Sequence, residues 1–481
     1  MKTTSNYFWQ NLKYFSDRIA LIDTSDDNSV TYNDLDIASD DIASRLKLSK
    51  KGLVFLFTTN NIESIITYIA VLKSGNAVLL LDEKLNEEIR IELINNYKPE
   101  FIITSREFIH ADYAKEYNYS DLKFYKRNKI LIFSTHDELS VLLSTSGTTG
   151  SPKLVRLAYK NIQSNAESIA EYLKIDESEK PITTLPFSYS YGLSVINSHL
   201  LKGATIVLTE KTVFFRDFWN LFNELNCTSF AGVPYTYTML KRINFTKIEL
   251  PTLKYMTQAG GKLGDELIRH FNDFALEKNI KFYVMYGQTE ATARITYVPP
   301  EILSNKIGSI GIAIPGGKLK IMKNGKEIMT PNEHGEIVYS GNNVMMGYAK
   351  IREDLSSGDE LKGTLFTGDL GYKDADGFFY VTGRMKRFIK IFGLRINLDD
   401  VQKRIENNFS ITAACTGTDD LLKILIHSED INSEIKVKNE VIKMYKLNFN
   451  SLVVKSTKII PTTNSGKYDY KKINELFDAD K

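Results

Sequence analysis

The sequence predicts an α/β fold: a large N-terminal domain of βαβ-type sheets covered by helices, a small barrel-like subdomain, and a small α+β C-terminal domain. Strand-sized apolar runs alternate with helical stripes through the first 300 residues, which is typical of parallel sheets covered by helices. Glycine turns then separate short strands, as in a small barrel or distorted sheet. The 481 residues, 43% of them hydrophobic, exceed one ordinary core, so two or three subdomains are expected.

The elements of the N-terminal part follow from apolar periodicity. The run at 53–57 predicts a buried strand, and apolar residues at helical spacing from Ile62 to Leu72 predict the next helix. The same reasoning predicts strands at 77–81, 101–104, 204–208, 229–233 and 281–285, and helices at 87–97 and 162–173. From about residue 306 the short strands begin, and a compact α+β tail closes the chain.

Composition excludes several classes of partner. Sixty-one basic and 59 acidic residues leave a net charge of +2 without long runs of one sign, so neither nucleic acid nor a membrane surface is an expected partner. Cys227 and Cys415 stand far apart, which favours a reducing, cytoplasmic compartment. Neither a signal peptide nor a membrane span is predicted, and the six scattered histidines do not have metal-ligand spacing.

A segment of hydroxyls and glycines, STSGTTGSPK from Ser144 to Lys153, follows an apolar strand. Glycines let backbone N–H groups turn toward an anion, hydroxyls add donors, and the lysine adds charge, so the segment predicts a phosphate-binding loop. Its spacing is not that of P-loop NTPases. The alternative is a surface linker. The loop residues expected to bind ATP or AMP are Thr145, Ser146, Gly147, Thr148, Thr149, Gly150 and Lys153.

The loop resembles the signature of the adenylate-forming superfamily, which includes acyl-CoA synthetases and the adenylation domains of peptide synthetases. Further segments resemble that family in the right order: LPFSYSYGLS from Leu185, QAGGKL from Gln258, YGQTE from Tyr286, FTGDLGYKDADGFFYVTGRMKR from Phe366, IKIFGLRINLDD from Ile389 and IIPTTNSGKYDY from Ile459. Leu154, Arg387 and Tyr470 depart from the usual pattern, but none of them replaces a catalytic group.

The resemblance implies a nucleotide site. Thr289 would contact the α-phosphate, and Glu290 would hold the Mg²⁺ that accompanies ATP, because a hard cation needs oxygen ligands. Asp369 would accept the ribose hydroxyls beside Arg384. The remaining residues implied in ATP or AMP binding are Gly260, Gly261, Tyr286, Gly287 and Arg395.

The resemblance also implies an acyl pocket, formed by Tyr189, Ser190, Val233 and Gln258. An apolar or aryl acid of modest size is the expected substrate. In adenylation domains for α-amino acids an aspartate occupies the position of Ser190 and pairs with the substrate ammonium. A buried, unpaired ammonium would be costly, so an α-amino acid is disfavoured.

The small domain is expected to move. The resemblance places a large domain over 1–384, a hinge over 385–388 with Lys386 at its centre, and a mobile lid over 389–481. Gly393 would line the tunnel for a pantetheine thiol. Lys467 would supply positive charge while a carboxylate attacks the α-phosphorus, which makes it, with Thr289 and Glu290, a predicted catalytic residue.

The resulting hypothesis is an acid–thiol ligase that forms an acyl-adenylate and then a thioester. It would use ATP and Mg²⁺, a small carboxylic acid, and either CoA or the phosphopantetheine of a carrier protein as acceptor. One alternative is an adenylating enzyme dedicated to a carrier protein. More distant alternatives are an NTPase or phosphotransferase, and a nucleotide sensor without catalysis.

Overall fold

The α/β class is confirmed by the computed structural model, which describes residues 7–129, 133–144, 153–385, 387–391, 394–418, 421–445, 447–463 and 467–478. For Phe388, Lys390, Leu394, Arg395 and Ile431 it describes the backbone alone. The chain divides into two compact units. The large unit comprises Met1–Lys318 and Ser340–Leu365, and the small unit comprises Leu319–Tyr339 and Phe366–Lys481. The hinge expected at 385–388 stays a prediction, because Lys386 lies outside the described residues.

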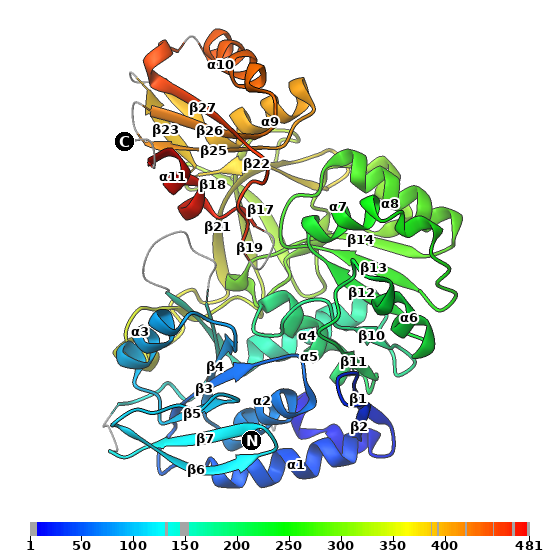
Figure 1. Cartoon of the computed structure of the whole chain (residues 1–481), viewed down its shortest axis with the longest axis vertical. Coiled ribbons are helices and arrows are strands. Elements are labelled where there is room, and N and C mark those ends of the chain that lie inside the picture. The colour runs from blue at the N-terminus through cyan, green and yellow to red at the C-terminus, as the bar shows by residue number, and fades with distance from the viewer. Residues whose placement is uncertain are drawn as a thin grey trace. The chain divides into compact units, whose positions relative to one another are not determined.

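Two sheets form the large unit (Figure 1). The first has nine strands, in the order β16 (Ile312–Ala313), β15 (Thr296–Tyr297), β14 (Lys281–Tyr286), β13 (Tyr255–Gln258), β12 (Ser229–Gly232), β10 (Pro181–Ile182), β11 (Ile206–Leu208), β1 (Ile19–Asp23) and β2 (Asn28–Thr31). The second has eight, in the order β20 (Gly347–Ala349), β9 (Leu154–Ala158), β8 (Leu139–Ser144), β4 (Ala77–Asp82), β3 (Leu53–Thr58), β5 (Phe101–Thr104), β7 (Leu122–Arg127) and β6 (Tyr113–Tyr119).

Helices cover both sheets in layers. One apolar core joins the two sheets through α1 (Tyr32–Arg45), α2 (Ile62–Ser74), α4 (Tyr159–Leu173) and α5 (Ser190–Leu200). A second core packs α6 (Arg216–Glu224), α7 (Pro234–Arg242) and α8 (Asp265–Glu277) on the other face of the nine-stranded sheet. A third packs α3 (Glu87–Tyr97) on the outer face of the eight-stranded sheet. This burial of both faces explains why β3 and β4 are continuously apolar.

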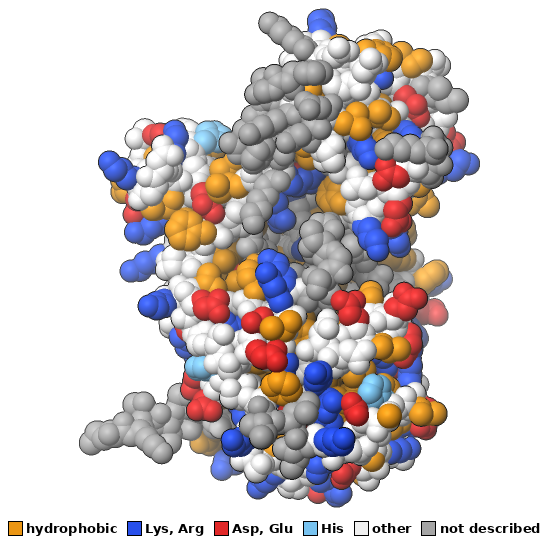
Figure 2. All heavy atoms as spheres, turned by 90° about the vertical axis from the view of Figure 1, so that its left-hand side faces the viewer, with side chains coloured by type: hydrophobic (Ala, Val, Ile, Leu, Met, Phe, Trp, Pro, Cys, Tyr) orange, Lys and Arg blue, Asp and Glu red, His pale blue; other side chains and the backbone are white. Residues whose placement is uncertain are grey.

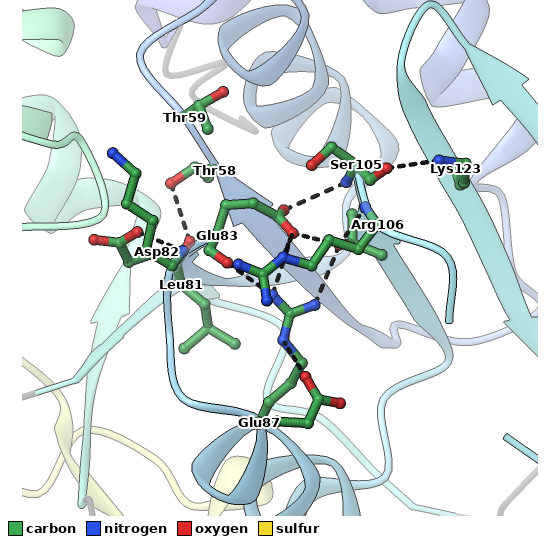
Figure 3. Close-up of polar contacts among 12 residues, drawn as sticks. Thr58, Thr59, Leu81, Asp82, Glu83, Glu87, Ser105, Arg106 and Lys123 are labelled. Atoms are coloured by element: carbon green, nitrogen blue, oxygen red, sulfur yellow. Dashed lines mark hydrogen bonds and ion pairs between the residues drawn. The ribbon is translucent and has the colours of Figure 1, made fainter. Parts of the chain in front are cut away.

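A buried carboxylate ties α3 to the ends of β4 and β5 (Figure 3). Glu83 is 5% exposed, and its Oε1 lies 3.2 Å from Nη2 of Arg90 and 3.3 Å from Nε of Arg106. The Thr104 hydroxyl donates to the same oxygen at 2.8 Å, and the Ser105 amide donates to Oε2 at 3.3 Å. Glu83, together with the more exposed Glu87, whose Oε2 lies 3.8 Å from Nε of Arg90, therefore compensates the charge of the almost fully buried Arg90 guanidinium.

The small unit contains three sheets. The short strands predicted after residue 306, except the one at 312–313, belong to a five-stranded sheet in the order β18 (Lys326–Glu327), β17 (Lys318–Lys323), β19 (Gly335–Ser340), β21 (Thr364–Lys373) and β22 (Phe379–Arg384). The hairpin of β23 (Phe388–Ile391) and β24 (Leu394–Asn397) follows. The three-stranded sheet β25 (Ala413–Thr418), β26 (Leu421–His427) and β27 (Leu452–Thr457) packs with α9 (Leu398–Phe409), α10 (Ile431–Tyr445) and α11 (Tyr470–Asp478).

Surface charge agrees with the composition. Figure 2 shows acidic and basic side chains interspersed on one face, without a broad field of one sign there. Among the helices that are described, none combines the length and the apolar character needed to cross a bilayer.

Candidate active site

Parallel strands bring the predicted site segments of the large unit to one edge of the nine-stranded sheet. Strands β12, β13 and β14 are parallel neighbours, with Gly232 opposite Gln258 and Gln258 opposite Val284. The segments that follow them therefore leave the sheet at the same edge. The crevice outside the carboxyl ends of parallel strands is where ligands bind in open α/β sheets.

The residues predicted for the acyl pocket lie beside the glycine turn at residues 260–261. Gly260 has φ of +87°, and a Cβ built there would lie 2.8 Å from the Tyr189 hydroxyl and 3.1 Å from Cγ1 of Val233. Gln258 donates from Nε2 to the carbonyl of Gly261 at 2.9 Å, which closes the turn. The turn therefore needs glycine at position 260, both for its backbone conformation and for space.

The acyl segment also meets the nucleotide segment. Ser190 begins α5, and its Oγ lies 3.3 Å from Oγ1 of Thr289 in the 3-10 turn η4 (Thr289–Ala291). This distance joins two segments that lie 99 residues apart. A group bound near Ser190 and a phosphate bound near Thr289 would be adjacent.

The loop after β14 folds tightly on itself. A Cβ on Gly287 would lie 1.7 Å from the carbonyl oxygen of Ala293, so this position excludes any side chain. The amide Nδ2 of Asn343 donates to the carbonyls of Ala291 and Arg294, each at 2.8 Å, and the Thr292 hydroxyl donates to the Asn343 carbonyl at 2.6 Å. Asn343 thus holds the loop that carries Thr289 and Glu290, and sequence reasoning did not identify it.

A tyrosine links Glu290 to the end of the signature loop. The Tyr348 hydroxyl donates to Oε1 of Glu290 at 2.7 Å, and Nζ of Lys153 lies 3.6 Å from the centroid of the Tyr348 ring. Tyr348 lies in β20, paired with Val155 of β9, directly after the loop. Burial and the neighbouring Glu290 carboxylate raise the pKa of Tyr348, so it remains a hydroxyl donor at neutral pH. Sequence reasoning did not identify this residue either.

Several predicted residues lie where the structure supports no description. Thr145, Ser146, Gly147, Thr148, Thr149, Gly150, Lys386 and Gly393 fall outside the described residues, and only the backbone of Arg395 is described. Ser144 of β8 pairs antiparallel with Leu154 of β9, so the signature loop begins and ends on two adjacent strands.

The small unit holds the residues predicted to bind ribose and one of the three predicted catalytic residues, Lys467. Asp369 in β21 is 2% exposed, and its Oδ1 lies 2.9 Å from Nε of Arg384, the residue opposite it in β22. Lys467 is exposed, and its carbonyl accepts hydrogen bonds from the backbone amide of Thr463 at 2.7 Å and from the Thr463 hydroxyl at 3.2 Å. The backbone of Lys467 is therefore held by Thr463.

Among the described residues, no group of three or more acidic, histidine or cysteine side chains could enclose a metal ion. Mg²⁺ does not require such a group, because it is usually held by one or two carboxylates together with substrate phosphates and water. Glu290 fits that role: Tyr348 engages Oε1, and no hydrogen bond or ion pair joins Oε2 to another described residue.

A small cavity, lined mostly by apolar atoms, lies deeper in the large unit, between α5 and strands β12 and β13. Its volume is about 20 Å³, and its polar lining includes Ser194, Ser198, His199, Tyr255, Thr257 and Arg294. The Val195 carbonyl lies 2.8 Å from Nδ1 of His199, and the Tyr255 hydroxyl lies 3.0 Å from Nε2. A carbonyl can only accept, so Nδ1 carries the proton and Nε2 accepts from Tyr255.

This histidine predicts a dependence of stability on pH. Burial lowers the pKa of His199 from 6.5 to about 4 in the folded protein, so the neutral form stabilises the fold fully above pH 6.5. The neutral His199 contributes about 3 kcal/mol to the free energy of unfolding above pH 6.5. This contribution is lost as the pH falls from 6.5 through 4. The free energy of unfolding of His199→Gln, measured by urea titration, should therefore fall less over this range than that of the parent protein. Equal slopes would show that His199 is not buried in its neutral form.

The chain is similar in sequence to known proteins over most of its length. A family model described as AMP-binding enzyme matches residues 8–349. The chain is 28% identical over 425 residues to a 2-succinylbenzoate–CoA ligase of Bacillus subtilis, covering 86% of this chain and 85% of the relative.

The chain also resembles solved structures over nearly its whole length. The o-succinylbenzoate CoA synthetase of Bacillus subtilis, in complex with its acyl-adenylate intermediate, has a TM-score of 0.76 and 25% identity, and the match covers 97% of each chain. An ATP-bound structure of MatB from Rhodopseudomonas palustris has a TM-score of 0.78 with 98% of each chain covered, and at 19% identity it supports the fold alone.

Proposed function

Because the chain belongs to the family of AMP-binding enzymes, we propose that it is an AMP-forming ligase that activates a carboxylic acid with ATP and transfers the acyl group to CoA. One observation carries this proposal. The contact between Ser190 and Thr289 supports it, because an acyl group bound near Ser190 would lie next to a phosphate bound near Thr289. A reaction that joins a carboxylate to AMP needs this adjacency.

The reaction has two steps. A carboxylate oxygen attacks the α-phosphorus, the bond to the β-phosphate breaks, and pyrophosphate leaves. The thiol sulfur of the acceptor then loses its proton and attacks the acyl carbon, and AMP leaves. Mg²⁺ held by Glu290 would neutralise charge on the triphosphate. Thr289 would donate to the α-phosphate, and Tyr348 would keep the Glu290 carboxylate oriented.

CoA is the acceptor that the relatives favour, since those matched over most of their length are named as CoA ligases. A carrier protein remains the alternative acceptor. Transfer of the acyl group to free CoA and to a phosphopantetheinylated carrier protein, compared at equal concentration, would separate the two.

Exchange of labelled pyrophosphate into ATP, dependent on an added acid, tests the proposal. The panel contains 2-succinylbenzoate, because relatives are named for that acid, together with aryl and straight-chain acids. An adenylating enzyme supports exchange with at least one acid. An NTPase or phosphotransferase would consume ATP without acid-dependent exchange, and a nucleotide sensor would do neither.

The ribose assignment predicts a loss of nucleotide affinity. Asp369→Ala removes a buried carboxylate that would accept two hydroxyl hydrogen bonds, so ATP binding should weaken by roughly 2–4 kcal/mol. Titration calorimetry with ATP measures this. Asp376→Ala, in the exposed turn between β21 and β22, is the matched control and should bind ATP like the parent. Unchanged affinity in Asp369→Ala would give Asp369 a structural role through Arg384 instead.

A further inference from the structure

Arg387, directly before β23, joins the start of α11 to two other parts of the small unit. Its guanidinium donates to the Tyr470 hydroxyl, and its Cζ lies 4.4 Å from the centroid of the Tyr470 ring. Its Nη2 donates to the carbonyl of Cys415 in β25 at 2.6 Å, and its backbone amide donates to the carbonyl of Arg384 at 3.2 Å. One residue therefore fixes the first residue of α11 against the three-stranded sheet and against the end of β22.

Tyr470 anchors the segment that carries Lys467, which lies three residues before it. Residues 467–469 pair antiparallel with residues 461–463 through backbone hydrogen bonds of 2.7 and 2.9 Å. Tyr470 follows this ladder directly, and its ring packs on the apolar cluster beneath α11. Burial raises the pKa of Tyr470 to about 12, so its hydroxyl stays neutral at physiological pH and accepts from Arg387. The position of Lys467 is therefore coupled to that of Arg387 through Tyr470.

A carboxylate extends the same connection to the residues predicted to bind ribose. Oδ1 of Asp399, in the first turn of α9, lies 3.0 Å from Nη1 of Arg387, and Oδ2 accepts from the Arg384 amide at 3.0 Å. Arg384 pairs with Asp369 through its side chain. Burial raises the pKa of Asp399, and the positive charge of Arg387 opposes that rise. These contacts form a continuous path from Asp369 and Arg384 through Arg387 to the segment of Lys467.

We infer that Arg387 is a positioning residue for acyl-adenylate formation, and that it acts by holding Lys467 in place relative to Arg384. This inference rests on the proposed ligase function and on the role predicted for Lys467. If Arg384 contacts the nucleotide, the path through Arg387 sets where the Lys467 ammonium lies with respect to the α-phosphate. A displacement of about 1 Å at a reacting centre can cost roughly 10²-fold in rate, even when its cause lies away from the chemistry.

Arg387→Met tests the inference, because it keeps much of the length of the side chain but removes its charge and its hydrogen bonds. In single-turnover assays, with an acid that supports pyrophosphate exchange, it should slow acyl-adenylate formation by roughly 10- to 10²-fold. Transfer from a preformed acyl-adenylate to CoA should stay within a few-fold of the parent rate. Arg387→Lys keeps a positive charge beside Asp399 and should recover part of the lost rate.

Tyr470→Phe is a milder test of the same contact. It keeps the aromatic ring and its packing under α11 and removes only the hydroxyl that accepts from Arg387. It should slow acyl-adenylate formation less than Arg387→Met and leave the transfer step unchanged. Each rate is measured well below the Tm of the variant concerned, so that all of the protein is folded.

A double-mutant cycle separates positioning from a purely structural role. If Arg387 acts through Lys467, Arg387→Met should change the rate of acyl-adenylate formation by less than about two-fold once Lys467 has been replaced by alanine. A residue that only stabilises the small unit would instead slow adenylation by the same factor with lysine or alanine at position 467.

Arg404 provides the matched control. It pairs with Asp400 at 2.9 Å, and the Tyr445 hydroxyl donates to the same carboxylate at 2.7 Å, so it too belongs to a group of an arginine, an aspartate and a tyrosine in the small unit. Its side chain is 54% exposed, and it lies in α9 rather than against α11. Arg404→Met should leave both half-reactions at the parent rate.

The contrary outcomes are distinct. Adenylation at the parent rate in Arg387→Met, or an equal loss in the parent and Lys467→Ala backgrounds, overturns the positioning inference and leaves the ligase proposal intact. A Lys467→Ala variant that adenylates at the parent rate also overturns the inference alone, since Arg387 would then have no residue through which to act. A parent enzyme that supports exchange with no acid overturns the ligase proposal, and the inference with it.

Discussion

Lys467→Ala should lower the rate of acyl-adenylate formation by roughly 10²–10³-fold, while transfer from a preformed acyl-adenylate to CoA stays within a few-fold of the parent rate. Attack of a carboxylate on the α-phosphorus brings two anions together, and the ammonium group would compensate the charge that builds on the oxygens. The second step has no such requirement. Lys467 is exposed in the small unit, so its replacement should not disturb packing.

Single-turnover assays of the two half-reactions measure this difference. Lys471→Ala is the matched control, because Lys471 is an exposed lysine only four positions away, in α11. It should leave both half-reactions unchanged. If Lys467→Ala slows both steps equally, or if Lys471→Ala slows adenylation as strongly, then Lys467 is not the residue that assists attack at phosphorus.

Glu83→Ala should destabilise the large unit by about 3–5 kcal/mol. The substitution leaves the Arg90 guanidinium, buried at 2% exposure, with only the exposed Glu87 carboxylate at 3.8 Å, and it removes the acceptor for the Thr104 hydroxyl and the Ser105 amide (Figure 3). Urea unfolding followed by tryptophan fluorescence reports on this unit, because both tryptophans, Trp9 and Trp219, lie in it.

An exposed ion pair in the same unit provides the comparison. Glu210 is 56% exposed and lies 3.0 Å from Nζ of Lys84, so Glu210→Ala should cost less than about 1 kcal/mol. The double variant Glu83→Ala with Arg90→Met should recover part of the lost stability, since it also removes the buried charge that has lost its nearer partner. A cost for Glu83→Ala as small as that for Glu210→Ala would show that solvent reaches Arg90.

Local signals predicted fewer than half of the helices and strands described in the large unit. The strand at 101–104 and the helix at 87–97 were predicted with the bounds that β5 and α3 have. The strand β9 was not predicted. All five of its residues are buried, including Arg156, a residue type that normally marks a solvent-facing position. The Arg156 charge is balanced by Glu360, 204 residues away, and sequence spacing cannot indicate such a partner.

The sequence predicted short strands after residue 306, but it did not assign all of them to the correct sheet. Residues 312–313 were expected in a barrel-like part, but they form β16, which pairs with β15 at the edge of the nine-stranded sheet. Glycine spacing predicts where a chain turns. It does not predict which sheet has a free edge to accept the next strand.

Two motif positions that depart from the family pattern contact each other in the structure, which the sequence could not indicate. Arg387 and Tyr470 each looked like an isolated substitution in the sequence. In the structure the Arg387 guanidinium donates to the Tyr470 hydroxyl, lies 4.4 Å from the centroid of its ring, and pairs with Asp399 at 3.0 Å. The two departures therefore compensate each other across 83 residues.

By itself, the sequence determined the α/β class and the family, and it predicted the segments expected to carry the chemistry, because side-chain period, turn residues and motif spacing are properties of neighbouring residues. Only the tertiary structure decided which groups meet. It placed Ser190 beside Thr289, Tyr348 on Glu290, Asn343 across the loop after β14, and Arg294 against Tyr191. Each of these contacts forms when distant segments pack together, and hydrogen bonding and charge compensation depend on distances in space rather than along the chain.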